Sequence, residues 1–385
     1  MSYYRTVIFI LTLLISCKVA GGSSLNNTFA RLESGKPVQI VVIGNSVTHG
    51  APAGEERTTS FYWALSDWLK EKFPEGDIRL QTSIIFAIGP ELQLFRMEDK
   101  VFRYKPDLLL AEFSAANGAW GPAGRKVTDP ATEGYIRRLR QNFPDCDIIL
   151  QLGLFKDMMQ WHERKETPPT AAFLKSLAIH YDCLLSDGQQ ELADRIISGT
   201  EWKALMKDGI HPGPEGYKVH SEILRKALDK AYAEYKKDPQ PVRSHAMPEK
   251  TLDENPWEKP LLVPASAARD VEGFESADFG RFKGLSTVKS GAALAFQPEK
   301  GRCVGILLRK PEQMGGLQIK TQEDWKELSL KSEPAAMEED DPKRNRIIRH
   351  FFHADGLPLY WEKIELRSWT EKGQSVQIIG FLVVE

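Results

Sequence analysis

Two short segments of the chain carry residue types that together could perform nucleophilic catalysis. The first ends in Ser46, which directly follows the apolar run Val38–Ile43 in the sequence Ile-Gly-Asn-Ser. A turn from the carboxyl end of a strand into a helix exposes a side chain at the edge of a sheet. It also directs backbone N–H groups toward whatever binds there. Such a turn suits a nucleophilic serine and an oxyanion site.

The second segment is Asp208–Pro212, which reads Asp-Gly-Ile-His-Pro. A serine nucleophile needs an imidazole to take its proton, and a carboxylate helps to orient that imidazole. Asp208 and His211 are three residues apart in a loop bounded by glycine and proline, so both side chains can face one cleft. An isolated Asp-x-x-His is more often a surface aspartate with a turn histidine. Asp208 and His211 can therefore act on a substrate only if the surrounding elements bring His211 to Ser46.

Those elements alternate between residues 38 and 235, where strand-like and helix-like segments follow one another. The first strand is a continuous apolar run, which is typical of strands buried on both faces of a sheet. Apolar residues at helical spacing mark the first of the intervening helices. The predicted strands are Val38–Ile43, Ile78–Ile85, Asp107–Phe113, Asp147–Leu152 and Cys183–Ser186, and the predicted helices are Phe61–Leu69, Leu92–Tyr104, Thr132–Asn142, Pro169–His180 and Gly216–Tyr235.

This alternation predicts an α/β fold, a parallel sheet with helices on both faces, whose ligands bind beyond the carboxyl ends of the strands. Residues 239–264 differ, because they contain six of the 23 prolines and no periodicity, and they are predicted to be a linker or a strap over the surface. Residues 265–385 are predicted to form an all-β sandwich. Its expected strands are Ala292–Phe296, Val304–Leu308, Leu317–Lys320, Arg346–Phe352, Ile364–Trp369 and Val376–Val384, and its expected core includes Phe296, Leu308, Ile319 and Ile364.

Taken in order, the blocks of residues 38–235 resemble the GDSL-like or SGNH hydrolases, which are serine esterases on a flavodoxin-like, three-layer α/β/α sheet. Gly44-Asn45-Ser46 is similar to the Gly-Asp-Ser block, with Asn in place of Asp. Asp208–Pro212, followed by Glu215-Gly216-Tyr217, is similar to the final block of one subgroup. The middle of that subgroup is matched by Phe95-Arg96, Lys105-Pro106-Asp107-Leu108 and Glu112-Phe113. The resemblance implies that Ser46 is the nucleophile, His211 the general base and Asp208 its partner.

The resemblance also implies an oxyanion hole, and here the sequence departs from the family. Ser46 N–H is one expected donor. The subgroup's Asn-Asp appears as Ala116-Asn117-Gly118, so either the Asn117 amide supplies a donor after a slip of one residue, or Ala116 occupies its place. The glycine-rich second block is eroded, and Gly89 N–H is the expected second donor, with Ala87 as the alternative. Loss of one such donor costs about 10²–10³ in rate.

These residues lead to three hypotheses. The first is an exported serine esterase that removes acetyl groups from a polysaccharide or glycan; the subgroup resemblance, the export signal and the appended β-domain, jelly-roll-like in related esterases, support it. The second is a glycan-binding protein with a degenerate hydrolase domain, and the third is a lipase or thioesterase of the same clan.

Loop aromatics that could stack on sugar rings are Trp120, Trp161 and Trp202. No cofactor or metal is expected, because His162-Glu163 has no further ligands at suitable spacing and is read as a solvated loop. His220 is expected to be a half-buried packing residue.

Composition and the N-terminus bound the remaining possibilities. The 385 residues are 42% apolar and 27% charged, with a net charge of −2, which fits an ordinary globular protein and argues against nucleic-acid binding. Residues 1–22 are predicted to be a secretory signal, because Arg5 precedes the apolar run Val7–Ile15 and small residues follow. Cys17 sits in a lipobox-like sequence that would give a lipid-anchored protein of the periplasm or outer membrane; cleavage after Gly21 would give a secreted one. Residues 23–238 would then be the hydrolase domain. Cys146 and Cys183 could pair in an oxidising compartment or stay as buried thiols.

Overall fold

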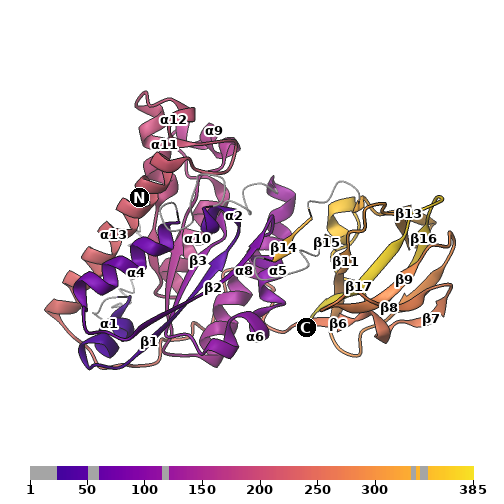
Figure 1. The fold of residues 1–385 in the computed structure, drawn as a ribbon, viewed down its shortest axis with the longest axis horizontal. Helices are drawn as coiled ribbons and strands as arrows, with labels where there is room; N and C mark the ends of the chain where they lie inside the picture. The colour runs from indigo at the N-terminus through magenta and orange to yellow at the C-terminus, as the bar shows by residue number, and fades with distance from the viewer. Residues whose placement is uncertain (1–23, 51–59, 115–120, 331–334, 339–345) are drawn as a thin grey trace, which may run out of the picture.

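The computed structural model of the chain describes residues 24–50, 60–114, 121–330, 335–338 and 346–385. Five parallel strands form the centre of the N-terminal domain, as predicted, and lie in the order β2-β1-β3-β4-β5 (Figure 1). The register pairs Ile40 of β1 with Leu80 of β2 and Leu108 of β3. The strands are β1 (Val38–Gly44), β2 (Ile78–Phe86), β3 (Leu108–Glu112), β4 (Asp147–Gln151) and β5 (Leu184–Ser186).

Alternate residues of β1 point into two different hydrophobic cores, because successive side chains of a strand face opposite sides of the sheet. Val38, Ile40 and Val42 pack with one group of helices, whereas Val41 and Ile43 pack with the other. The first group is α1 (Asn26–Glu33), α4 (Phe61–Lys72) and α13 (Pro214–Lys237), and the second is α5 (Pro90–Leu94), α6 (Met97–Lys100), α8 (Gly121–Asn142) and α10 (Pro169–His180). The predicted three-layer α/β/α architecture is confirmed.

Short helices at the upper end of this domain surround a smaller core of their own (Figure 1). They are α9 (Met159–Glu163), α11 (Gly188–Ile197) and α12 (Trp202–Leu205). Another short helix, α2 (Ser46–His49), directly follows β1, and short 3₁₀ turns occur at Phe102–Tyr104, Lys156–Met158, Ala265–Ala267 and Phe352–Asp355. Two predicted helices differ from the structure. The helix expected over Leu92–Tyr104 is broken into α5, α6 and a 3₁₀ turn, and α8 begins well before Thr132 and continues through Pro130.

The C-terminal domain is a sandwich of two antiparallel sheets, as predicted. Its buried side chains include all four residues expected in the core, Phe296, Leu308, Ile319 and Ile364. Among the described residues, one sheet has the order β13-β12-β16-β10-β7 and the other β15-β11-β17-β9-β8. The strands are β7 (Arg269–Glu272), β8 (Glu275–Asp278), β9 (Lys283–Thr287), β10 (Ala293–Phe296), β11 (Arg302–Arg309), β12 (Gly316–Lys320), β13 (Trp325–Glu327), β15 (Ile347–Phe351), β16 (Ile364–Trp369) and β17 (Val376–Val384).

The proline-rich segment after α13 is a strap held against the N-terminal domain. Asn27 donates to the carbonyl of Arg243 and accepts from its N–H at 2.8 and 3.0 Å. Further along, the N–H groups of Leu252 and Asp253 donate to the carboxylate of Glu133. The prediction of a linker up to residue 264 needs one correction. Its last five residues form β6 (Pro260–Pro264), which pairs with β17 because an edge of that strand remains open beyond β9.

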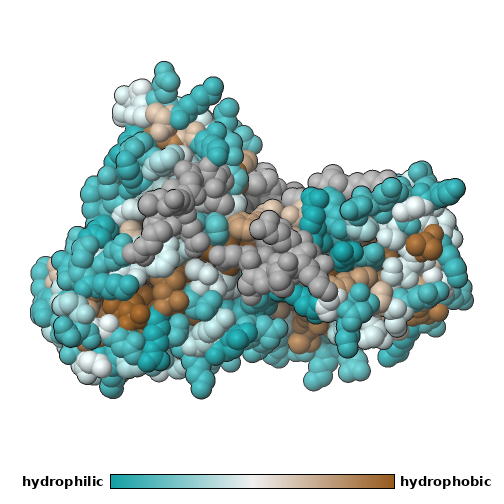
Figure 2. Space-filling model, viewed as in Figure 1, coloured by the Kyte–Doolittle hydropathy of each residue, from teal (hydrophilic) through white to brown (hydrophobic). Residues whose placement is uncertain are grey.

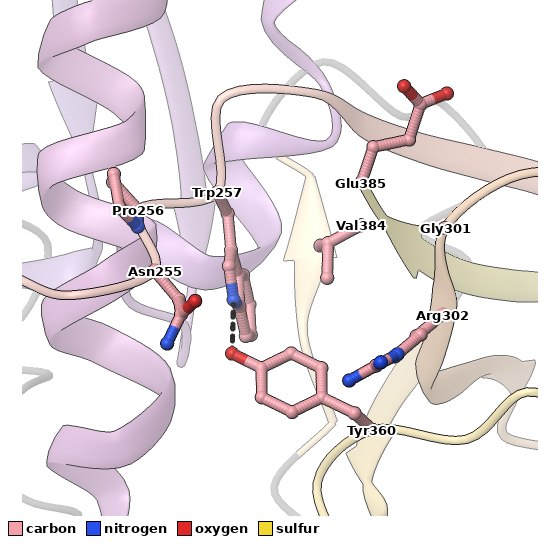
Figure 3. Close-up of a pocket in the computed structure, with 8 residues that line it drawn as sticks. All are labelled: Asn255, Pro256, Trp257, Gly301, Arg302, Tyr360, Val384 and Glu385. Carbon is pink, nitrogen blue, oxygen red and sulfur yellow. Dashed lines mark hydrogen bonds between the residues drawn. The ribbon is translucent and has the colours of Figure 1, made fainter.

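Trp257, near the end of the strap, joins the two domains. Its ring lies 5.9 Å from that of Phe351 in the sandwich and 6.4 Å from that of Phe95 in the N-terminal domain. Its indole N–H donates to the hydroxyl of Tyr360 at 3.2 Å (Figure 3). Its backbone also lies against α8 at Gly134, where a Cβ would come within 2.4 Å of the Trp257 carbonyl oxygen. The closeness of these contacts requires glycine at that position.

A single hydrophobic core therefore extends across the domain boundary, from Leu92 and Ile136 to Val304, Leu307 and Leu382. The C-terminal domain therefore packs directly on the N-terminal domain. Removing the sandwich would expose these side chains to water. A polar cavity of about 660 Å³ lies at the same boundary (Figure 3).

The C-terminal domain also extends the parallel sheet. The two-residue strand β14 (Met337–Glu338) runs antiparallel to β2, with Met337 opposite Phe86 and Glu338 opposite Ile85. In Figure 1, β14 lies between the two domains. The sandwich domain thus touches β2 at its carboxyl end, which is the edge of the sheet where ligands of such folds bind.

Cys146, Cys183 and Cys303 are buried free thiols, so the structure contains the unpaired alternative for the first two. Burial raises the pKa of Cys183 to about 12. Among the described residues, no helix combines the length and the apolar character that a membrane span requires. The face in Figure 2 is mostly hydrophilic. Cys17 and the predicted signal lie outside the described residues.

His245 links the strap to the sheet, and we expect this link to weaken as the pH rises. Its Nε2 lies 2.8 Å from Asp147 Oδ1 and its Nδ1 3.6 Å from Asp182 Oδ2. Burial opposes the charged imidazolium, but the hydrogen bonds to Asp147 and Asp182 outweigh it, so the pKa of His245 is raised. Because the pKa of His245 is higher in the folded than in the unfolded chain, protonation of this ring stabilises the fold. The added stability is fully present below the unfolded-state pKa of about 6.5, and it is lost as the pH rises through the folded-state pKa.

The test is thermal unfolding of His245→Gln at pH 6 and pH 8.5. We expect a larger loss of Tm at pH 6, by about 2–4 °C for each kcal/mol of stability lost. His180→Gln is the control, because this half-buried ring hydrogen-bonds a backbone carbonyl of the same strap, that of Lys250. An equal loss of Tm at both pH values would contradict the prediction.

Candidate active site

The structure brings the three predicted catalytic residues together at the carboxyl edge of the sheet. Ser46 Oγ lies 2.8 Å from His211 Nε2. His211 Nδ1 lies 2.8 Å from Asp208 Oδ2. Ser46 is half-buried, and the His211 side chain is 20% exposed, so a substrate can reach both. This is the order of contacts in which an imidazole takes a proton from a serine while a carboxylate holds the ring.

Asp208 is built to stay ionised and to hold His211 in one orientation. Its Oδ1 accepts the backbone N–H groups of Ile210 and His211, each at 2.8 Å, which leaves Oδ2 for the imidazole. Partial burial opposes ionisation, but the two backbone N–H groups and the His211 ring outweigh it and lower the pKa of Asp208. The carboxylate is therefore charged at neutral pH and stabilises an imidazolium beside it.

The turn that carries Ser46 is fixed by its neighbours in the sequence. Asn45 caps α2, since its Oδ1 accepts the N–H of Val47 at 2.9 Å, and Thr48 completes a capping box. Gly44 is required here, because a Cβ would lie 1.9 Å from Thr48 Oγ1. The Asn in place of the family's Asp thus serves as a helix cap.

Side chains from distant elements support the same turn. Glu112, at the end of β3, accepts from Asn45 Nδ2 at 3.1 Å and from the hydroxyl of Ser114 at 2.8 Å, and both acceptor oxygens are buried. Tyr217, from the final sequence block, donates its hydroxyl to the carbonyl of Val47 at 2.7 Å. Gln93 of α5 donates to the carbonyl of Gly44 at 2.8 Å. Sequence reasoning quoted Glu112 and Tyr217 as motif residues without a role, and it missed Gln93 altogether.

The loop with Asp208 and His211 is held from two sides. The indole N–H of Trp202 donates to the Asp208 carbonyl at 2.9 Å, and the N–H of Lys156 donates to the Gly209 carbonyl at 2.8 Å. Trp202 is half-buried against the small core of the short helices. The structure therefore gives Trp202 a role in positioning the loop, and the sugar-stacking role expected from sequence stays a prediction.

The remaining tryptophans and histidines singled out in the sequence lie in different surroundings. Trp161 is half-buried on α9, with the guanidinium of Arg164 over its ring at 5.6 Å. Trp120 lies outside the described residues. His162 is buried beside Gln189, with 3.0 Å between His162 Nε2 and Gln189 Nε2, so the reading of a solvated loop is wrong. His220 is fully buried, where half-burial was expected, and burial lowers its pKa to about 4.

The expected oxyanion donors need one correction. Gly89 N–H donates to Glu91 Oε1 at 3.2 Å, and both groups are buried, so Gly89 is not available to a substrate. The alternative, Ala87, is exposed immediately after β2 and has a φ of 60°. A left-handed backbone of this kind favours glycine, which is the residue of the family's second block. Ala87 is thus the remaining candidate for the second donor besides Ser46 N–H, and Asn117 lies outside the described residues.

The fold is of the three-layer α/β/α type, and it carries a Ser–His–Asp arrangement at the carboxyl ends of the parallel strands. Residues 42–219 match the model of the GDSL-like Lipase/Acylhydrolase family. An isoamyl acetate-hydrolyzing esterase of Saccharomyces cerevisiae is 23% identical over 151 residues. That match spans 35% of this chain and 63% of the yeast protein, which is less than two thirds of its length.

Solved structures resemble the whole chain, including the sandwich. A two-domain esterase active on acetylated mannans, co-crystallized with mannopentaose, matches 95% of this chain and 96% of its own at 16% identity, with a TM-score of 0.71. Another structure of such an esterase matches 94% of this chain and 95% of its own, with a TM-score of 0.67. At this identity the likeness shows a shared fold for both domains.

Proposed function

We propose that the protein is a serine esterase that removes acetyl groups from carbohydrate. The observation that carries the proposal is the pair of 2.8 Å contacts that connects Ser46 Oγ through the His211 ring to Asp208. A domain with an impaired site would have no need of this connection. The carbohydrate part of the proposal is supported by the two-domain fold shared with an esterase active on acetylated mannans.

The geometry suits the following sequence of steps. Ser46 Oγ attacks the carbonyl carbon of the ester while His211 Nε2 takes its proton, and the oxyanion forms beside Ser46 N–H and the loop after β2. His211 then gives the proton to the departing sugar hydroxyl, which leaves the acyl group on Ser46. A water molecule, deprotonated by His211, releases acetate and restores the serine. Asp208 stabilises the imidazolium in both halves of the reaction.

Export from the cytoplasm is part of the proposal. It is supported by Arg5 and the apolar run Val7–Ile15, which lie outside the described residues. An extracellular or periplasmic location would bring the enzyme to polysaccharide. Lipid attachment at Cys17 would keep it at a membrane, whereas cleavage after Gly21 would release it.

Acyl length and leaving group distinguish the hypotheses. We expect hydrolysis of 4-nitrophenyl acetate with kcat/KM at least tenfold higher than for 4-nitrophenyl octanoate, and release of acetate from acetylated mannan. Preference for the octanoate would favour a lipase. Binding of acetylated mannan without release of acetate, together with no turnover of any nitrophenyl ester, would instead favour a glycan-binding protein.

A further inference from the structure

A chain of buried polar contacts connects the sandwich domain to the loop after β2. Arg349, on β15, is fully buried, and its Nε lies 3.2 Å from Glu91 Oε1. Glu91 is in the first turn of α5 and is 2% exposed. The same oxygen, Oε1, accepts the N–H of Gly89 at 3.2 Å. One carboxylate oxygen thus holds both a cation of the C-terminal domain and the backbone of the N-terminal domain.

The segment held in this way is the one that carries the candidate oxyanion donor. Only Ala87, Ile88 and Gly89 lie between the end of β2 and the start of α5. The sandwich domain contacts this segment at both ends, because β14 pairs with Phe86 before it and Arg349 binds Glu91 after it. Ala87 itself has a φ of 60°, a conformation that a residue with a side chain adopts only when its surroundings impose it.

The ion pair is suited to imposing that conformation. A buried carboxylate needs a charged partner and good hydrogen bonds, so removing the guanidinium would leave Glu91 to move toward water or to another partner. Movement of Glu91 would release Gly89 N–H and with it the backbone two residues from Ala87. A shift of this kind is small, but a donor must lie about 2.7–3.1 Å from the oxyanion to be effective.

We propose that Arg349 is a positioning residue for the esterase: through Glu91 it fixes the segment Ala87–Gly89, so that this segment can supply a backbone donor to the oxyanion. The inference rests on the proposed function, since it assigns a part of that same site. It means that the sandwich domain contributes to the chemical step without placing a side chain of the triad in the cleft.

The test compares Arg349→Met with Arg367→Met in the full chain. Arg367 is a matched control, because it is a half-buried arginine of the same domain that hydrogen-bonds Gln318 on the neighbouring strand. With 4-nitrophenyl acetate, we expect Arg349→Met to lower kcat about 10–100-fold with KM changed less than twofold, since a lost oxyanion donor costs about 10²–10³. Inhibition by phenylboronic acid, which forms a tetrahedral adduct with a serine, should weaken by a similar factor. Arg367→Met should change neither.

Two further variants keep the test decisive if Arg349→Met does not fold. Glu91→Gln is close in shape and keeps an acceptor for Gly89 N–H but not the charge, and we expect a smaller loss of kcat, about threefold to tenfold. Arg349→Lys keeps the charge and should recover part of the activity lost in Arg349→Met. A folded Arg349→Met or Glu91→Gln with wild-type kcat and wild-type boronate inhibition overturns the inference, even if its Tm is lower.

The same assay separates this inference from the proposed function. Wild-type protein that turns over the ester, with the activity lost in Ser46→Ala, supports the esterase whatever Arg349 does. Wild-type protein without turnover contradicts the esterase and the inference with it. Hydrogen exchange adds a readout without substrate: Arg349→Met should speed exchange of the amides in residues 86–91, and Arg367→Met should not.

Discussion

Ser46→Ala is expected to lower kcat for 4-nitrophenyl acetate by about 10⁴–10⁶, the largest change that any single substitution in this chain should cause. In serine hydrolases, loss of the nucleophile or the base removes nearly all of the catalysis that the triad provides. The contact of Ser46 Oγ with His211 Nε2 is the only link in the described site that could activate a hydroxyl in this way. KM is expected to change little, because substrate contacts outside the reacting atoms remain.

Stability should not change with Ser46→Ala, which separates a catalytic effect from a structural one. The turn is held by the Asn45 cap and by the hydroxyl of Tyr217, and neither contact uses Ser46 Oγ. Ser176→Ala is the matched control, because this exposed serine of α10 donates its hydroxyl to the carbonyl of Ala172, one turn earlier in the same helix. Wild-type turnover by Ser46→Ala would show that another group attacks the ester.

The triad and the sheet could be predicted because their signals are local. The first parallel strand is an apolar run interrupted only by Gln39, and it ends where the turn with Ser46 begins, so its place in the sequence indicates its place at the site. Asp208 and His211 are close in sequence, and Asp208 needs only the neighbouring N–H groups to hold its orientation. In such cases the local pattern and the tertiary structure agree.

The oxyanion loop could not be predicted in the same way, because its conformation depends on the other domain. Nothing in the sequence around Gly89 indicates that its N–H binds Glu91, or that Glu91 in turn binds Arg349, which is more than 250 residues away. The burial of His162 and His220 has the same origin: each faces a glutamine side chain from another element, Gln189 or Gln151. Hydrophobic periodicity and composition predict the helix or strand to which a residue belongs. They do not predict these contacts, which come from packing between elements.

The second large effect is expected at the domain boundary, where Trp257→Ala should lower the free energy of unfolding by about 3–5 kcal/mol. Trp257 is 1% exposed and packs between Phe95 and Phe351, so truncation would leave a cavity between the domains. It would also remove the donor to Tyr360. Because the strap backbone lies against Gly134, the domains cannot close over this cavity without moving the strap from α8.

Urea unfolding followed by circular dichroism measures this change, with Trp369→Ala as the control. Trp369 is 39% exposed on β16, and its truncation should alter stability by about 0.5 kcal/mol or less. If the shared core makes the two domains unfold together, the wild type shows one transition, and Trp257→Ala shows either one transition at lower urea or two. Two transitions already present in the wild type, with neither shifted by Trp257→Ala, would contradict the view that the boundary is part of one core. That result would also weaken the case for Arg349, since a domain that moves freely could not hold Glu91 in place.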